Sequence, residues 1–321
     1  MSYKAPVSLL LSEKFVDQFR AKLDPLMKVG RGLDLRVLTG RGSDPTDGEA
    51  AFLSPDEFPD APAGLFRTAL KAPALKWFHT LSAGTDHPAF GALVDRGVQL
   101  TTSSGAAAVP IAQAVFMQLL ALTRGLPTML RNQSDRTWDR IHGTDLADHT
   151  LAIAGMGPIG IEVAQLAAAF GMRAVGLRRT VSGTEPCQTW TLDRWHEALA
   201  IADFVVLALP LTAETRLLLD AEAISHMRHG AIVVNVGRGE LIDEPAMIGA
   251  LRTGRIGAAG LDVTTVEPLP VDSPLWTMGN VIITPHNSAA IPSTNAAVAE
   301  IFFDNLGRYL RGEPLRNEVQ S

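Results

Sequence analysis

The sequence predicts an α/β protein with two domains, each a doubly wound parallel β-sheet covered by helices on both faces. Short β-type runs alternate with helical or turn-rich segments along the chain, which is typical of parallel sheets. The length of 321 residues favours two domains over one. In addition, residues 150–160 run from an apolar strand through a glycine-rich turn into a helix. The elements are justified below in chain order.

Composition narrows the possible functions. Hydrophobic residues make up 46% of the chain and charged residues 19%, as in well-packed soluble proteins. The net charge of −6 argues against a nucleic-acid partner. The apolar run 7–11 is too short for a signal peptide, and no stretch approaches the ~20 apolar residues of a membrane span. We therefore expect a cytoplasmic protein with no membrane contact. Cys187 is the single cysteine, which excludes an internal disulfide, and we interpret it as an inert thiol.

The N-terminal third is expected to form one sheet, with strands at residues 7–11, 33–38, 50–53, 75–80 and 98–102. Ser12 is a suitable N-cap for the first helix, which would place four apolar side chains on one face: Phe15, Val16, Phe19 and Leu23. Segments 40–48 and 54–64 are rich in Gly, Pro and Asp and are interpreted as surface connections.

A loop of small residues follows the fourth predicted strand at Ser82, Ala83 and Gly84. Ligands of open α/β sheets bind at the carboxyl ends of strands. Backbone N–H groups at Ala83 and Gly84 can hydrogen-bond to a carboxylate. A simple turn is the alternative interpretation of this loop.

The glycine-rich turn has the pattern of a Rossmann dinucleotide-binding motif. Gly155 would permit the tight turn, Gly157 the close approach of a pyrophosphate, and Gly160 the packing of helix against strand. Phosphates bind at such helix N-termini, where Pro158 is also well tolerated. The expected cofactor-binding residues of the motif are Gly155, Met156, Gly157, Pro158, Ile159 and Gly160.

The remaining elements continue the same alternation. A helix is expected at 106–126 before the motif, broken at its end by Gly125 and Pro127. The next strand after the motif is expected at 172–177. Further strands are predicted at 204–208, 231–236, 258–263 and 281–284, with helices at 221–229 and 244–252. The amphipathic segment 294–311 is expected to form a helix that packs back onto the first domain.

Three residues with suitable chemistry each follow a predicted strand: Arg238, Glu267 and His286. A cation, an acid and a histidine suit reduction of a 2-keto acid, which needs a cation for the carboxylate and a proton donor for the carbonyl oxygen. Taken singly, a structural histidine or a surface ion pair is the alternative. His226 and His229 would share a helix but lack a third ligand, so no metal site is expected.

The order of these motifs resembles the D-isomer-specific 2-hydroxyacid dehydrogenase family, most closely its glyoxylate/hydroxypyruvate reductases. The matching stretches are 82–86, 155–160, 209–215, 234–239, 260–263, 267–268 and 284–286. The resemblance implies that Arg238 holds the substrate carboxylate and polarises the ketone. It implies that His286 protonates the developing alkoxide and that Glu267 orients the His286 ring.

The resemblance also assigns further residues to ligands. Substrate contacts would come from Ser82, Ala83, Gly84, Arg238 and His286. Additional cofactor contacts would come from Leu209, Pro210, Thr215, Val236, Gly237 and Asp262, with Asp262 at the nicotinamide end.

By the same resemblance, a flavodoxin-like substrate domain comprises residues 1–104 and the returning C-terminal helix in 292–321. An NAD(P)-binding Rossmann domain, 105–291, is inserted between these parts. Catalysis is expected in the cleft between the two domains. A homodimer formed through the nucleotide domain is the expected assembly.

Cofactor choice departs from the family default. In many NAD sites an acid about 20 residues beyond the glycines binds the ribose 2′-OH. Here the second strand ends in Arg178, Arg179 and Thr180, which suit the 2′-phosphate of NADP. We therefore expect a reductase of small 2-keto acids that prefers NADPH, with NAD possible. The arginine-bearing second strand resembles that of glyoxylate/hydroxypyruvate reductases, which implies glyoxylate or hydroxypyruvate as the substrate.

Two alternatives stay open at this point. The first is an NAD-dependent D-2-hydroxyacid or phosphoglycerate-type dehydrogenase, although we expect no C-terminal regulatory domain of the kind that many phosphoglycerate enzymes carry. The second is a non-catalytic module that senses dinucleotides. The joint presence of Arg238, Glu267 and His286 argues against the second, because a sensor needs no proton donor.

Overall fold

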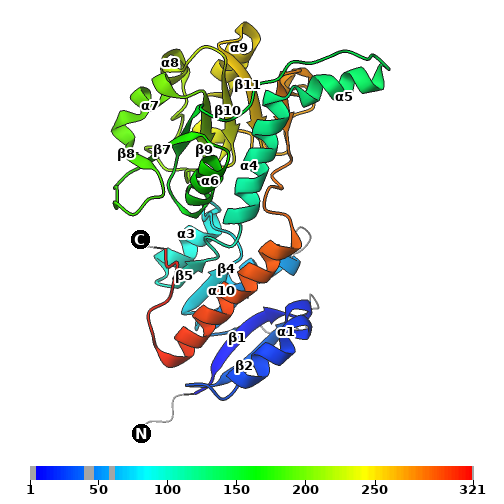
Figure 1. Cartoon of the computed structure of the whole chain (residues 1–321). Coiled ribbons are helices and arrows are strands. Elements are labelled where there is room, and N and C mark those ends of the chain that lie inside the picture. The colour runs from blue at the N-terminus through cyan, green and yellow to red at the C-terminus, as the bar shows by residue number, and fades with distance from the viewer. Residues whose placement is uncertain (1–4, 40–46, 58–61, 320–321) are drawn as a thin grey trace. The chain divides into compact units, whose positions relative to one another are not determined.

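The structure is a computed structural model that describes residues 5–39, 47–57 and 62–319. The chain divides into two compact units, Met1–Ala106 with Pro292–Ser321, and Ala107–Ile291. Within the described residues, the first unit holds a five-stranded sheet and the second a seven-stranded sheet (Figure 1). Every strand pairs in parallel with its neighbours. The predicted fold class is confirmed.

The sheet of the first unit has the strand order β2-β1-β3-β4-β5, which is the order of flavodoxin-like sheets. Its strands are β1 (Val7–Ser12), β2 (Leu33–Leu38), β3 (Ala50–Leu53), β4 (Trp77–Thr80) and β5 (Gln99–Thr102). Successive side chains enter opposite cores: Leu9 and Leu11 belong to one, Leu10 to the other. This alternation explains the continuous apolar run, since both faces of the sheet are covered.

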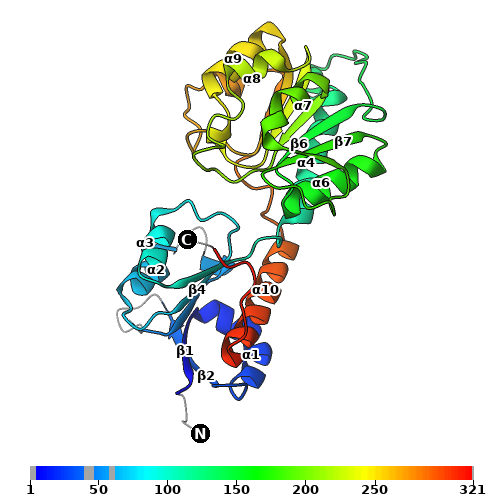
Figure 2. The ribbon, with the colours of Figure 1, turned by 90° about the vertical axis from the view of Figure 1, so that its left-hand side faces the viewer.

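Helices α1 (Glu13–Leu26) and α10 (Pro292–Arg311) cover one face of this sheet, as Figure 2 shows. Helices α2 (Pro62–Lys71) and α3 (Pro88–Asp95) cover the other. The predicted cap of α1 is confirmed, because Ser12 Oγ accepts a hydrogen bond from the Phe15 amide at 3.1 Å. Phe302 of α10 stacks on Phe52 of β3 at 4.1 Å between ring centroids, so the C-terminal helix completes the first core.

The two predicted surface connections have different outcomes. Most of 40–48 lies outside the described residues. In 54–64 the chain forms a short 3-10 turn, η1 (Pro55–Glu57), and the beginning of α2, while 58–61 lie outside the described residues.

The sheet of the second unit has the order β12-β11-β10-β9-β6-β7-β8. Its strands are β6 (Thr150–Ala154), β7 (Arg173–Arg178), β8 (Gln188–Thr191), β9 (Phe204–Leu207), β10 (Ala231–Asn235), β11 (Ile256–Leu261) and β12 (Val281–Ile283). The first strand, β6, lies between β7 and β9, so the sheet grows in both directions from it. This is the Rossmann arrangement, in which ligands bind where the strand order reverses.

Helices cover both faces of this second sheet. Helices α4 (Ala108–Thr123) and α6 (Pro158–Ala169) pack on the face that includes Leu151 and Ile153 of β6 (Figure 2). Helices α7 (Trp195–Ile201), α8 (Ala221–His226) and α9 (Glu244–Thr253) pack on the opposite face. Both faces of β6 are therefore buried, which explains its uninterrupted apolar sequence.

Some predicted elements differ from the structure. The helix expected at 106–126 is α4, which ends at Thr123, and a second helix that was not expected, α5 (Leu126–Ser134), follows it at an angle of 64°. Gly125 adopts the left-handed conformation there, with φ of 69°, and Pro127 is tolerated in the first turn of α5. Helix α8 ends at His226, so His229 lies beyond it.

No single helix in the described part of the chain is long and apolar enough to cross a membrane. The bent pair α4 and α5 meets the length and composition test only when the two helices are taken together.

Candidate active site

The predicted ligand-binding residues of the second unit lie in loops after strands β6, β7, β9, β10, β11 and β12. Because these strands are parallel, their carboxyl ends meet at one edge of the sheet. The structure therefore brings the glycine-rich turn, Arg238, Glu267 and His286 to the same edge.

The glycine-rich turn has the backbone that its sequence predicts. Gly155 has φ of 104°, and a Cβ atom there would lie 2.6 Å from the carbonyl oxygen of Ala208. A Cβ at Gly160 would lie 1.9 Å from the Gly155 carbonyl oxygen, so only glycine allows this packing. In contrast, a Cβ at Gly157 meets no atom within 4 Å, and Gly157 is the N-cap of α6 without a side-chain cap. The amides of the first turn of α6 thus remain open to an anion.

The loops after β9 and β10 are held rigidly beside this turn. Thr215 Oγ1 donates to the Pro210 carbonyl at 2.7 Å and accepts from the Thr212 amide at 2.8 Å. Gly237 packs so closely on this loop that a Cβ atom would lie 2.8 Å from the Leu209 carbonyl oxygen. The predicted residues Leu209, Pro210, Thr215, Val236 and Gly237 are therefore parts of one packed pair of loops.

A residue that the sequence interpretation missed fixes Arg238. Asn235, which is fully buried, donates from Nδ2 to the Arg238 carbonyl at 2.8 Å and accepts from the Gly237 amide at 3.0 Å. The half-buried Arg238 side chain donates to the Gly237 carbonyl at 2.8 Å. The available indication was that Asn235 lies within the matching stretch 234–239, at the end of a buried strand, where a buried amide needs partners.

His286 and Glu267 form a direct pair. The distance between His286 Nδ1 and Glu267 Oε2 is 2.8 Å, and the other carboxylate oxygen of Glu267 accepts from the Thr264 amide at 3.1 Å. Both side chains are exposed enough to reach a ligand. A histidine held in this way has its tautomer set by the carboxylate, which leaves Nε2 for proton exchange.

The backbone at His286 is also unusual. It has φ of 49°, a left-handed conformation that is rare for histidine, and its amide donates to the Asp262 carbonyl at 2.8 Å. Such conformations persist where the surroundings impose them, often at functional sites.

Asp262 imposes that conformation. Its buried carboxylate accepts hydrogen bonds from Thr284 Oγ1 at 2.6 Å, from the amides of Asn287 and Ser288 at 3.1 and 3.2 Å, and from Ser288 Oγ. These contacts fasten the loop on both sides of His286. The implied contact of Asp262 with the nicotinamide end of the cofactor stays a prediction.

The predicted substrate loop of the first unit rests on a buried polar network. Ser82 Oγ donates to the Gly84 carbonyl at 2.8 Å, and the Ser82 carbonyl accepts from the Ser103 amide at 3.2 Å. Beneath it, the ring of His79 contacts Thr101 Oγ1 at 2.7 Å and Ser103 Oγ at 3.1 Å. Burial lowers the pKa of His79 to about 3, so the ring stays neutral.

Comparison with known proteins decides the family. The sequence model described as "D-isomer specific 2-hydroxyacid dehydrogenase, NAD binding domain" matches residues 116–288. The chain belongs to the D-isomer specific 2-hydroxyacid dehydrogenase family. It is thus an NAD(P)-dependent oxidoreductase of a family that acts on small 2-hydroxy and 2-keto acids.

Three relatives illustrate the similarity of this family member. Glyoxylate/hydroxypyruvate reductase B of Salmonella newport is 37% identical over 257 residues, which cover 78% of this chain and 79% of the reductase. D-3-phosphoglycerate dehydrogenase of Methanocaldococcus jannaschii is 35% identical over 253 residues, 78% of this chain but only 48% of that protein. A D-isomer specific 2-hydroxyacid dehydrogenase of Xanthobacter autotrophicus, solved with NADPH and MES, has a TM-score of 0.78 and 33% identity, with 99% of this chain and 98% of that chain covered.

The dehydrogenase has a feature at the end of β7 that the sequence interpretation did not include. Arg178 Nη1 lies 2.6 Å from Glu185 Oε1, and the Glu185 side chain is 3% exposed. Hydrogen bonds from the Ser182 amide and hydroxyl lower the pKa of Glu185 well below its ordinary value, and Arg178 adds to this effect. Arg179 is 82% exposed, with its nearest carboxylate oxygen, on Glu214, at 4.0 Å. Thr180 is exposed beside it.

Cys187 is half-buried against the α4–α6 core of the dehydrogenase, and burial raises the pKa of its thiol, as expected for an inert cysteine. One group of possible metal ligands gathers among the residues that the structure describes: His196, Glu222 and His226. The absence of a third ligand near His226 was therefore predicted wrongly.

Proposed function

We propose that this family member reduces a small 2-keto acid, glyoxylate or hydroxypyruvate, to the D-2-hydroxy acid with NADPH as the preferred reductant. The observation that carries the proposal is the 2.8 Å pair of His286 and Glu267, at the same sheet edge as Arg238. The likeness to glyoxylate/hydroxypyruvate reductase B supports this substrate class.

In the proposed reaction, each site residue has a separate role. The bound nicotinamide supplies the hydride. Arg238 donates hydrogen bonds to the substrate carboxylate and polarises the ketone, and its carbonyl is fixed by Asn235 so that the guanidinium starts from a defined backbone. Glu267 holds Nδ1 of His286, and the proton passes from Nε2 to the developing alkoxide.

Two loops are proposed to hold the catalytic histidine and the substrate in position. Asp262 keeps His286 in its left-handed conformation through the contacts to Thr284, Asn287 and Ser288. In the first unit, the proposed role of the 82–84 loop is to offer backbone N–H groups to the substrate carboxylate. Its shape is maintained by the hydrogen bond from Ser82 Oγ to Gly84.

The second unit fits a dinucleotide. The open space at Gly157 and the uncapped first turn of α6 suit a pyrophosphate. Arg178, Arg179 and Thr180 follow at the end of the next strand, where the 2′ substituent of the ribose is read in such folds. The Xanthobacter autotrophicus relative was solved with NADPH, which supports this cofactor.

Direct turnover tests the proposal. Oxidation of NADPH and of NADH is followed by absorbance with glyoxylate, hydroxypyruvate, pyruvate and phenylpyruvate. We expect the highest kcat/KM with NADPH and one of the first two acids, and a D-configured product from hydroxypyruvate; the product of glyoxylate is achiral. Absence of oxidation with all four acids, or an L-configured product from hydroxypyruvate, would refute it.

A homodimer through the second unit belongs to the same proposal. Large apolar side chains are exposed on α4 and α5, including Met117 and Leu130, which are 52% and 56% exposed. Several large exposed apolar side chains on two consecutive helices are typical of an interface between protein chains. Light scattering is expected to give a dimer that Leu130→Glu weakens. Ile201→Glu is the matched control, because Ile201 is exposed and apolar but lies on α7, which packs on the opposite face of the sheet from α4. An unchanged mass for Leu130→Glu would refute this interface.

A further inference from the structure

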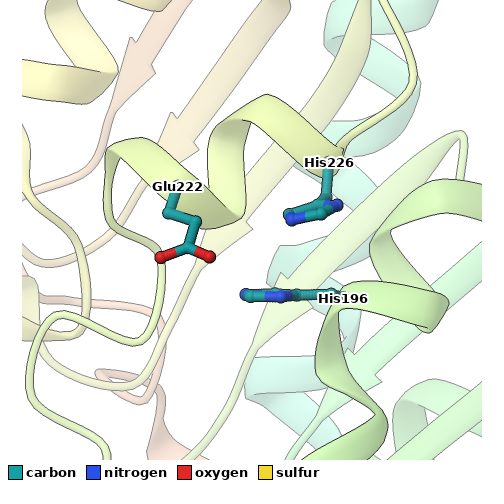
Figure 3. A group of neighbouring side chains, drawn as sticks. All are labelled: His196, Glu222 and His226. Atoms are coloured by element: carbon teal, nitrogen blue, oxygen red, sulfur yellow. The ribbon is translucent and has the colours of Figure 1, made fainter.

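The outer layer of the second unit carries a cluster of three side chains that serve as metal ligands in proteins. His196 lies in the first turn of α7, while Glu222 and His226 lie on α8 (Figure 3). One ligand atom from each lies within 4.8 Å of the other two. We propose that these residues form a surface site for a divalent transition metal, with Zn²⁺ as the representative ion.

The sequence spacing on α8 places two of the three ligands on the same side of the helix. Glu222 and His226 are four residues apart, so they occupy the same side of the helix one turn from each other. Figure 3 shows both directed toward the ring of His196 on the neighbouring helix. The two imidazole rings are stacked, with centroids 4.3 Å apart and planes inclined by 16°.

The geometry needs only a small side-chain adjustment. Bonds of about 2.0–2.1 Å in a tetrahedral site place ligand atoms about 3.3–3.4 Å apart. The present limit of 4.8 Å is larger by about 1.5 Å, and the stacked imidazole rings must also turn so that their nitrogen lone pairs converge on one ion. All three side chains are exposed, so rotation about their χ angles can close this gap without moving either helix.

The ligand set indicates the kind of ion. Two imidazoles and one carboxylate suit Zn²⁺, Cu²⁺ or Ni²⁺, whereas Mg²⁺ and Ca²⁺ prefer oxygen ligands alone. A fourth position would remain for water, because the cluster is open to solvent. The three residues lie outside the loops that carry Arg238, Glu267 and His286. The bound ion would therefore fasten α7 to α8 and would not take part in reduction.

Calorimetric titration of the full chain with Zn²⁺ tests the proposal. The protein carries no histidine tag and is freed of chelator beforehand. We expect one Zn²⁺ per chain and a higher midpoint of thermal unfolding with the ion, because binding to the folded state stabilises it. Loss of a residue that only hydrogen-bonds to a metal ligand already lowers metal affinity by about 10–100-fold. His196→Ala and His226→Ala remove direct ligands, so each should weaken Zn²⁺ binding by at least about tenfold.

His229→Ala is the matched control, since His229 is an exposed histidine just beyond α8 that is not in the cluster. It should leave the Zn²⁺ affinity unchanged. Circular dichroism without metal verifies that each variant is folded. The proposal is overturned if the wild type binds no Zn²⁺, or if His196→Ala and His226→Ala bind it as the wild type does. Loss of binding only in His286→Ala would overturn it as well, because the ion would then occupy the His286–Glu267 pair.

Discussion

The cofactor preference provides a sharp quantitative test, because the two arginines after β7 differ in their surroundings. A hydrogen bond to a charged group contributes about 1.5–3 kcal/mol. Arg178 is 35% exposed but must give up Glu185 to bind a phosphate, so we take the lower end, about 1.5 kcal/mol. Arg179 is 82% exposed, and exposed ion pairs contribute about 0–1 kcal/mol.

Together the two arginines are expected to favour NADPH over NADH by roughly 2 kcal/mol, which is about 30-fold in affinity. This is less than the roughly 3–6 kcal/mol that two arginines without competing carboxylates or solvent screening would give. Arg178→Ala should cost NADPH binding about tenfold, and Arg179→Ala less than about fivefold. Neither should change NADH binding, because NADH presents only a hydroxyl at this position.

The assay is a fluorescence titration with NADPH and NADH at low and at high salt. Arg173→Ala is the matched control, since Arg173 is exposed at the opposite end of the same strand. Glu185→Gln should tighten NADPH binding, because Arg178 then has no competing carboxylate. Equal affinities for the two cofactors in the wild type, or a larger loss in Arg179→Ala than in Arg178→Ala, would refute the reasoning.

Two further predictions concern histidines. His286→Ala should lower kcat by about 10²–10⁴-fold, because a positioned general acid is lost. The Kd for NADPH should be unchanged, because no contact to the cofactor phosphates is removed. Turnover above a third of the wild type would exclude His286 as the acid. His79, with its pKa of about 3 in the folded state, stays neutral while the unfolded chain takes up a proton below about pH 6.5. The contribution of His79 to the free energy of unfolding is therefore fully present above that pH. It falls by about 1.4 kcal/mol per pH unit as the pH decreases toward 3. Urea unfolding at two pH values should show a flatter slope for His79→Gln, and parallel slopes would contradict this origin.

Local sequence patterns were sufficient for most of the fold. Runs such as 9–11 and 151–154 are apolar throughout because both faces of a parallel strand are buried. The glycine-rich turn was predictable in detail, since Gly155 and Gly160 leave no space for a side chain. The break at Gly125 was predicted too, but the restart as α5 was not, because proline in a first turn is compatible with a new helix.

Features that depend on contacts between distant residues could not be predicted. Glu185 lies in a turn without sequence regularity, and its pairing with Arg178 depends on how that turn folds back. His196 and His226 belong to different helices, and only the packing of α7 on α8 brings them together. β8 and α7 are short, with four and seven residues, so their periodicity is too brief to recognise.

The chain of contacts around Asp262 explains why the proposed acid lies on a loop and yet has a defined position. Gln118 of α4 donates from Nε2 to Thr284 Oγ1 at 3.1 Å, and Thr284 donates in turn to Asp262 at 2.6 Å. A Cβ atom at Gly260 would lie 2.3 Å from Gln118 Oε1, so glycine is required there for α4 to approach β11. The position of His286 is thereby connected to a buried helix on one side and to Glu267 on the other. A proton donor held in this way loses little entropy when substrate binds, which is the advantage of a preorganised site.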